Sequence, residues 1–263
     1  HFIGIGGISM SGLAEILFEE HFTISGSDSK ESELTRHLEH MGMQIFYGQK
    51  ASNIIEGIDL IVYTAAIRED NPEFAAAKEK GIPMLSRAEL LGQIMDNYQN
   101  SIAVSGTHGK TTTTSMISQI LLAAKKDPTI TVGGILKAID GNLRVGKSDV
   151  FISEACEYTN SFLNFRPKYS IILNIEAEHL DFFKDIHDIR NSFHLFAKNT
   201  KENGAIIING EIENYQEIVE GLAPQVITYG MSDACDFYPA DITFNEKACA
   251  NFTAMYHGEK VMN

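Results

Sequence analysis

The stretch IAVSGTHGKTTTTSM, residues 102–116, decides how the middle of this chain folds. The apolar run at 101–105 predicts a strand, and the residues from Lys110 onward predict a helix. Gly106 and Gly109 allow the connection to turn sharply, because glycine has no Cβ to clash at positive φ. The N–H groups of such a turn and the positive end of the helix attract anions, so the stretch predicts a phosphate-binding loop.

One missing glycine leaves two interpretations of this loop. The usual pattern, Gly-x-x-x-x-Gly-Lys-Ser/Thr, would place glycine where the chain has Val104. The segment is either a chance glycine-rich turn before a Thr-rich helix or a shorter phosphate loop. In the second case Lys110 would bridge the β and γ phosphates of ATP, and the Thr111 hydroxyl would hold Mg²⁺. The residues of the loop predicted to bind ATP are Gly106, Thr107, His108, Gly109, Lys110, Thr111 and Thr112.

Two polar side chains further along the chain are expected to reach the same place. Glu154 follows the strand-like run DVFIS, and His179 follows the run YSIILN. Parallel strands present ligands at their carboxyl ends, so both side chains should lie at the edge that carries the loop. A carboxylate is a good Mg²⁺ ligand, and imidazole is a less usual one. Taken singly, Glu154 could instead form a strand-end salt bridge, and His179 could be an ordinary loop histidine.

The N-terminal stretch HFIGIGGISMSGLAE, residues 1–15, is a second glycine-rich turn between a strand and a helix. Gly4 and Gly6 fit a dinucleotide fingerprint, and Asp28 ends the next strand at about the required spacing of roughly 20 residues. The third glycine of the fingerprint is replaced by Ser9. The turn is therefore suited to a diphosphate of any nucleotide, and a tight turn without a ligand is the alternative.

The order of apolar runs predicts an α/β fold with two domains. Short apolar runs alternate with helical patterns over residues 1–95, which predicts a Rossmann-like parallel-sheet domain at 1–98. The polar segment DNYQNS at 96–101 marks the boundary, and a P-loop α/β ATPase domain is predicted over 99–263. Beyond about residue 235 the pattern favours an antiparallel hairpin at the sheet edge.

Composition excludes several classes of partner and site. A net charge of −14 disfavours nucleic acid and anionic lipid. The three cysteines lack metal-site and disulfide-scaffold spacing, and no run approaches the roughly 18 apolar residues of a membrane helix. We therefore expect a cytoplasmic protein without membrane insertion, as a monomer or dimer. The chain begins at His1 rather than methionine, and we expect it to be a piece of a longer protein.

Several motifs together resemble the Mur ligases. They are HFIGIGGISMSGLAEIL with GSD, SGTHGKTTTTSM, SEACEYTNSFLNF and ILNIEAEHLD, which span His1 to about Phe196. This family uses the short loop Gly-Thr-x-Gly-Lys-Thr/Ser, so the absence of glycine at 104 is expected there. The resemblance implies three domains, of which this chain holds the first and most of the second. The C-terminal amino-acid-binding domain would be missing, so residues 1–263 alone should be inactive.

The resemblance also implies an activity. Histidine at the variable loop position, His108, is typical of the member that joins L-alanine to the lactyl carboxylate of UDP-N-acetylmuramic acid. That ATP-dependent ligation passes through an acyl phosphate and serves peptidoglycan synthesis. The alternative is a ligase that adds a tripeptide to the same sugar nucleotide in peptidoglycan recycling, and Tyr158 slightly favours it. An NAD-dependent oxidoreductase would leave the loop at 106–112 without a role, and a regulatory P-loop ATPase would not need the first domain.

By match to the family, particular residues are expected to act. Lys110, Glu154 and His179 would be catalytic, and Asn174 would belong to the ATP site. Thr111 and Glu154 would hold one Mg²⁺ and His179 a second, with Mn²⁺ as a substitute. The UDP-sugar would contact Gly6, Gly7, Ser9, Met10, Ser27, Asp28, Thr64, Ala65 and Ala66.

Three positions depart from the family pattern. Ser9 replaces a usual glycine, Cys156 replaces a usual aspartate, and Glu178 replaces the aspartate beside the histidine. Ser9 is small and keeps a hydrogen-bond donor, so UDP binding should be retained. Cys156 cannot be assigned the charge of an aspartate on this basis alone.

Overall fold

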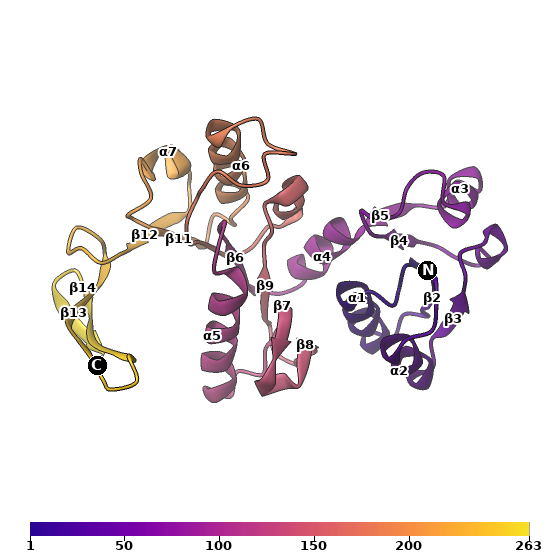
Figure 1. Ribbon diagram of the computed structural model, residues 1–263, viewed down its shortest axis with the longest axis horizontal. Helices are drawn as coiled ribbons and strands as arrows, with labels where there is room; N and C mark the ends of the chain where they lie inside the picture. The colour runs from indigo at the N-terminus through magenta and orange to yellow at the C-terminus, as the bar shows by residue number, and fades with distance from the viewer. Residues whose placement is uncertain (263) are drawn as a thin grey trace.

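The computed structural model describes residues 1–262 as two sheets that lie side by side along the long axis of the molecule (Figure 1). The first sheet has the strand order β3-β2-β1-β4-β5 and is parallel throughout, as predicted. Its strands are β1 (Phe2–Ile3), β2 (Ser25–Asp28), β3 (Gln44–Tyr47), β4 (Ile61–Tyr63) and β5 (Met84–Ser86).

The helices of the first unit are α1 (Ile8–Glu19), α2 (Glu33–Met41), α3 (Pro72–Glu79) and α4 (Arg87–Asp96), with a 3₁₀ turn at Ala51–Asn53. Side chains cap the free N–H groups at the start of three of the four helices, whereas α1 starts after Gly7 without a side-chain cap. Ser32 and Ser86 each cap a helix in a reciprocal capping box. Asn71 caps α3 just before Pro72, and proline is favoured at this first helical position.

The second sheet has ten strands in the order β15-β14-β13-β12-β11-β10-β6-β9-β7-β8. Strands β6, β9, β10, β11 and β12 are mutually parallel, and β7 joins them parallel to β9. The predicted hairpin after residue 235 is present as the antiparallel β13 to β15 at the sheet end. The strands are β6 (Asn100–Ser105), β7 (Thr129–Leu136), β8 (Gly141–Arg144), β9 (Val150–Glu154), β10 (Tyr169–Ile172), β11 (Ala205–Asn209), β12 (Gln225–Tyr229), β13 (Phe237–Phe244), β14 (Ala250–Tyr256) and β15 (Glu259–Met262).

Three α-helices accompany this sheet, α5 (Lys110–Ala123), α6 (Ile186–Lys198) and α7 (Gln216–Val219), with 3₁₀ turns at Lys137–Ile139 and Tyr158–Asn164. Two elements differ from the sequence prediction. The run ENYQEIVEGL, residues 213–222, predicts a helix of that length, whereas α7 has only four residues. Strand β7 with its antiparallel partner β8 was not predicted. The pair Gly133-Gly134 inside β7 interrupts a pattern that otherwise favours a strand.

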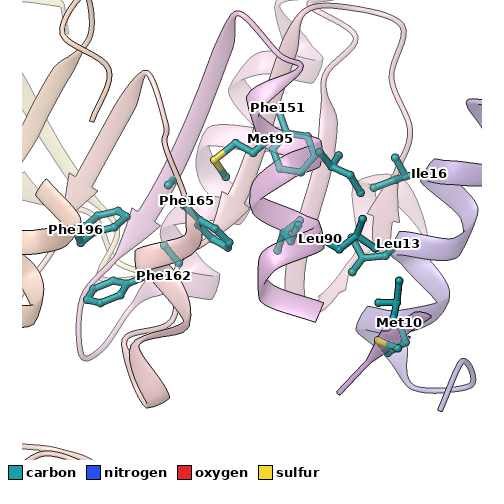
Figure 2. Close-up of a cluster of buried hydrophobic side chains, with 14 of the residues drawn as sticks. Met10, Leu13, Ile16, Leu90, Met95, Phe151, Phe162, Phe165 and Phe196 are labelled. Atoms are coloured by element: carbon teal, nitrogen blue, oxygen red, sulfur yellow. The ribbon is translucent and has the colours of Figure 1, made fainter. Parts of the chain in front are cut away.

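One hydrophobic core runs through both units, and helix α4 connects its two parts. Figure 2 shows side chains of α1 and α4 beside Phe151 of β9 and the phenylalanines of the 158–164 turn region. Gly92 on α4 permits this packing, since a Cβ there would lie 2.1 Å from the Asn164 carbonyl oxygen. The labelled members of the cluster are Met10, Leu13, Ile16, Leu90, Met95, Phe151, Phe162, Phe165 and Phe196.

Within residues 1–262, every helix is too short or too polar to cross a bilayer.

Candidate active site

The predicted phosphate loop has the expected geometry between β6 and α5. Gly106 and Gly109 have φ angles of 138° and 83°, which only glycine adopts readily. A Cβ at Gly106 would also lie 2.9 Å from the Leu173 Cβ. Both glycines are therefore required by the backbone path, and the loop needs no glycine at Val104, which is fully buried in β6.

Asn174 braces this loop from the end of β10. Its Oδ1 accepts a hydrogen bond from the His108 N–H at 2.8 Å, and its Nδ2 donates to the His108 carbonyl at 3.0 Å. The Thr107 N–H donates to the Asn174 carbonyl, and the Thr107 hydroxyl accepts from the Glu176 N–H. The predicted ATP-site residue Asn174 thus lies at the loop and fixes its backbone.

Lys110, the first residue of α5, turns its amine back toward the loop. Its Nζ donates to the carbonyl oxygens of Gly106 and Thr107 at 2.5 and 3.2 Å. It also contacts both carboxylate oxygens of Glu157, at 2.9 and 3.2 Å. The Lys110 amine is thereby held at the mouth of the loop, where a phosphate chain would pass.

Thr111 and Glu154 lie together, as predicted for a shared Mg²⁺. The Thr111 hydroxyl donates to Glu154 Oε2 at 3.0 Å, and Glu154 Oε1 accepts from the Gly133 N–H at 2.6 Å. A Cβ at Gly133 would lie 3.0 Å from that carboxylate, so β7 approaches it closely. A hydroxyl and a carboxylate are hard oxygen donors of the kind Mg²⁺ prefers, and the pair fits such an ion.

His179 meets a different carboxylate. Its Nε2 lies 3.7 Å from Glu157 Oε1, and within residues 1–262 the three groups that could share a cation there are Glu157, Glu178 and His179. The ring of His179 packs on Tyr158 at a centroid distance of 4.6 Å, and the Tyr158 hydroxyl donates to Asp181. That hydrogen bond raises the pKa of Tyr158 above its ordinary value. His179 is therefore brought to Lys110 through Glu157.

Sequence reasoning missed Glu157 as a site residue. It stands three positions after Glu154 in the run SEACEY, and nothing in that run shows that its side chain is only 2% exposed. The neighbouring Cys156 has no charge to contribute, since burial raises the pKa of its thiol above the ordinary value. A further departure, Glu178, faces His108 across 4.0 Å at the exposed surface of the loop.

The predicted sugar-nucleotide residues gather at the carboxyl edge of the first sheet, after β1, β2 and β4. The Gly6 N–H donates to Asp28 Oδ2 at 2.9 Å, which ties the glycine-rich turn to the end of β2. The segment that follows β4 contains Thr64, Ala65 and Ala66. Thr64 lies beside the glycine-rich turn, since a Cβ at Gly4 would be 3.6 Å from its methyl group. Gly7 caps α1, whose first turn carries the exposed Ser9.

Two of these residues have side chains turned into the protein. Met10 is 2% exposed and belongs to the core of Figure 2. The Ser27 hydroxyl donates to the buried Glu73 at 2.5 Å. Any contact from Met10 or Ser27 to a ligand at this edge is thus left to backbone atoms.

A pocket of about 190 Å³ is lined by residues of both the first and the second unit. Ser9 and Gly12 of α1 line it from the first unit, and Gly133 and Glu154 line it from the second. Arg87, at the start of α4, also lines it, and burial lowers the pKa of its guanidinium. A ligand seated on the first turn of α1 could therefore extend to Glu154 without leaving the pocket.

Comparison with known families agrees with this arrangement. Residues 1–99 match the Mur ligase family, catalytic domain, and residues 104–261 match the Mur ligase middle domain. The chain is 73% identical over 263 residues to the UDP-N-acetylmuramate–L-alanine ligase of Agathobacter rectalis, covering all of this chain and 57% of that protein. A ligase of the same name from Lachnoclostridium phytofermentans is 54% identical and is covered to 58%. The chain thus spans little more than half the length of these curated relatives.

Solved structures with this fold include two kinds of ligase. A UDP-N-acetylmuramate:L-alanyl-γ-D-glutamyl-meso-diaminopimelate ligase from Neisseria meningitides superposes with a TM-score of 0.86 at 27% identity, covering 99% of this chain and 84% of that chain. A UDP-N-acetylmuramate–alanine ligase from Thermotoga maritima has a TM-score of 0.80 at 29% identity, covering 100% of this chain and 59% of that one. With both of its domains matched, the chain belongs to the Mur ligase family.

Proposed function

We propose that the full-length protein joins L-alanine to the lactyl carboxylate of UDP-N-acetylmuramic acid at the expense of ATP. The observation that carries this proposal is 73% identity, over the whole chain, to a relative named for that reaction. The clustering of Lys110, Thr111 and Glu154 at one sheet edge supports the ATP-dependent step. We place the reaction in the cytoplasm, the compartment that supplies ATP.

The proposal divides the work between the two sheets. Residues 1–98 would hold the UDP-sugar at the edge formed by Gly6, Asp28 and Thr64, where backbone N–H groups can face a diphosphate. Residues 99–263 would hold ATP at the phosphate loop. The pocket between Ser9 and Glu154 would then bring the lactyl group of the sugar toward the γ phosphate. Binding of the amino acid would fall to the part of the longer protein that this chain lacks.

Thr111 and Glu154 would hold one Mg²⁺, and His179 with Glu157 and Glu178 could hold a second cation. Such ions, Mg²⁺ or Mn²⁺, would neutralise the charge that accumulates when a carboxylate approaches a triphosphate. Lys110 would add its own positive charge at the β and γ phosphates, and the loop N–H groups would fix their position. An acidic chain can thus use acidic substrates, because the charge at the reacting atoms is set locally.

The reaction balances in two steps. A carboxylate oxygen of the lactyl group attacks the γ phosphorus, the bond to the β-phosphate oxygen breaks, and ADP leaves with an acyl phosphate remaining. The amine of L-alanine then attacks the acyl carbon, loses a proton and expels inorganic phosphate. In the first step Lys110 would stabilise the spreading charge on the transferred group.

The main rival is a ligase that adds a tripeptide to the same sugar nucleotide. Overall shape does not separate the two, since the TM-scores are 0.86 and 0.80. Sequence favours L-alanine, because the curated relatives at 73% and 54% identity carry that name. Phosphate release by the full-length protein with ATP, Mg²⁺, UDP-N-acetylmuramic acid and L-alanine tests the choice. Turnover with the tripeptide and none with L-alanine would contradict the proposal.

A further inference from the structure

Glu157 is a buried charge whose contacts with Lys110 and His179 are not accounted for by the proposed second cation site alone. Within residues 1–262, Glu73 and Glu157 are the buried carboxylates, at 0% and 2% exposure. A buried carboxylate is costly unless it is paired or hydrogen-bonded, so its surroundings should account for it. For Glu157 these surroundings are two residues of the proposed reaction centre.

Glu157 connects the three segments that meet at the edge of the second sheet. It follows β9, Lys110 begins α5 after β6, and His179 follows β10. Both of its oxygens lie within 3.2 Å of the Lys110 amine, and Oε1 lies 3.7 Å from His179 Nε2. One carboxylate thus contacts the lysine of the loop and the histidine of the neighbouring strand end.

The pairing with Lys110 is shielded from solvent. The Lys110 and Glu157 side chains are 15% and 3% exposed, whereas exposed ion pairs are weak because water screens them and the side chains lose entropy. A lysine has four flexible carbons and three donor hydrogens, so a free Lys110 would sample many positions. Glu157 and the carbonyls of Gly106 and Thr107 together restrict it to one.

His179 is restrained on a second side. Its backbone has a positive φ of 54°, which is uncommon for a residue with a Cβ. Tyr158, the residue after Glu157, packs against the imidazole and is itself fixed by its hydrogen bond to Asp181 at 2.9 Å. The consecutive residues Glu157 and Tyr158 therefore both act on the position of His179.

We propose that Glu157 is a positioning residue, which holds Lys110 and His179 in register for the phosphoryl transfer. This inference rests on the proposed function. Lys110 can keep one donor hydrogen on Glu157 while the others turn to phosphate oxygens, because an ammonium group has three. Glu157 then needs no contact with ATP itself. Its effect should appear in the transition state, where small displacements of catalytic groups are costly.

The test is Glu157→Gln in the full-length enzyme, assayed by phosphate release under saturating sugar nucleotide and amine acceptor. We expect kcat to fall by about 10- to 100-fold, the size typical of supporting contacts around a reaction centre. KM for ATP should stay within about threefold, because the bound phosphates themselves attract Lys110. Glu157→Asp, which keeps the charge on a shorter stem, should recover part of the lost kcat. If Glu157→Gln does not fold, Glu157→Asp alone should still lower kcat at constant KM.

Glu69→Gln is the matched control. Glu69 forms an exposed ion pair with Lys78 at 3.6 Å in the first unit, and its loss should change neither kcat nor KM by more than about twofold. Active sites are counted by UDP-sugar binding, so that a smaller folded fraction is not taken for a lower kcat. A kcat per site within twofold of the parent, or a KM for ATP that rises as kcat stays constant, would overturn the positioning role.

Failure of the proposed function gives a different pattern. If the parent enzyme turns over with a tripeptide and not with L-alanine, the proposed acceptor is wrong. The Glu157 comparison is then made with the tripeptide, since it concerns the ATP step that precedes either amine. An equal kcat for parent and Glu157→Gln with that acceptor would still refute the positioning role.

Discussion

Two glycine-rich turns, each between a parallel strand and a helix, occupy the edges of the two sheets, and they differ in the side chains around them. The turn after β1 is tied through the Gly6 N–H to Asp28, and the residues predicted to surround it are small or neutral apart from that carboxylate. The turn after β6 has Lys110, Thr111 and Glu154 within hydrogen-bonding distance of one another or of the loop. The same backbone device thus suits binding in the first unit and reaction in the second.

Each unit also contains a buried glutamate, Glu73 in the first and Glu157 in the second, and the groups that contact the two carboxylates differ. Glu73 accepts hydrogen bonds from the Ser27 hydroxyl and the Asn53 amide, both at 2.5 Å. The His1 ring nitrogen Nε2 also lies 3.7 Å from Glu73, and these contacts, all within the first unit, make Glu73 a structural support for the end of β2. Glu157 is paired with the charged amine of Lys110. Because Lys110 is proposed to meet phosphate as well, Glu157 would belong to the reactive edge.

The largest effect should come from Lys110→Ala. Removing the amine takes away the positive charge at the transferred phosphoryl group, and we expect kcat to fall by at least about 10³-fold. UDP-sugar affinity, measured by calorimetry, should stay within about twofold. Lys126→Ala, at an exposed position beyond the end of α5, is the control and should behave like the parent. Loss of sugar binding with ATP binding retained would reverse the assignment of the two turns.

Asp28→Ala should have a smaller effect, and it should impair binding of the UDP-sugar rather than the ATP-dependent step. Without this acceptor the Gly6 N–H loses its partner and the first turn loses its tie to β2, so we expect the Kd for the UDP-sugar to rise by about 10-fold. ATP-analogue affinity should not change. Asp59→Ala, exposed and away from the turn, is the matched control. A change in ATP affinity as large as the change in sugar affinity would show that the two edges do not act separately.

The sequence was enough to predict the α/β class, the loop and most of the residues that meet at each edge. Glycines at turns and apolar runs act locally, and residues at the carboxyl ends of parallel strands must converge, which is why Glu154 could be placed near the loop. Asn174 was expected there from the family resemblance. Burial of a charge is a long-range property. Glu157 is enclosed by segments after β6 and β10, and nothing within its own run indicates that environment.

The packing contact between the two units could not be predicted from the sequence either. Gly92 lies inside a helical pattern, where glycine is normally unfavourable, and its purpose is visible only from the Asn164 carbonyl that would clash with a Cβ. Met10 fits a turn motif by position but belongs to the core by side chain. Motifs assign positions in the chain, whereas the direction of a side chain depends on the helix that follows.

The smallest expected effect concerns Glu73, the buried glutamate of the first unit, and is measured as the pH dependence of thermal stability. Burial alone would raise the pKa of Glu73, but interactions with His1, Ser27 and Asn53 outweigh it and hold the pKa below its ordinary value. A carboxyl with a lowered folded-state pKa stabilises the protein above its unfolded pKa, and that contribution is lost as pH falls through the folded value. The thermal stability of the parent should therefore fall as the pH drops below about 4.3, the ordinary glutamate pKa.

Glu73→Gln removes this titration, so its melting temperature should lie a few degrees below that of the parent near neutrality and approach it as the pH falls. A difference of about 2–4 °C is the expected scale for one such contribution in a chain of this size. Glu79→Gln, at an exposed position on the same helix, is the control and should follow the parent at every pH. A Glu73→Gln curve parallel to the parent at all pH values would mean that folding does not shift the pKa of Glu73.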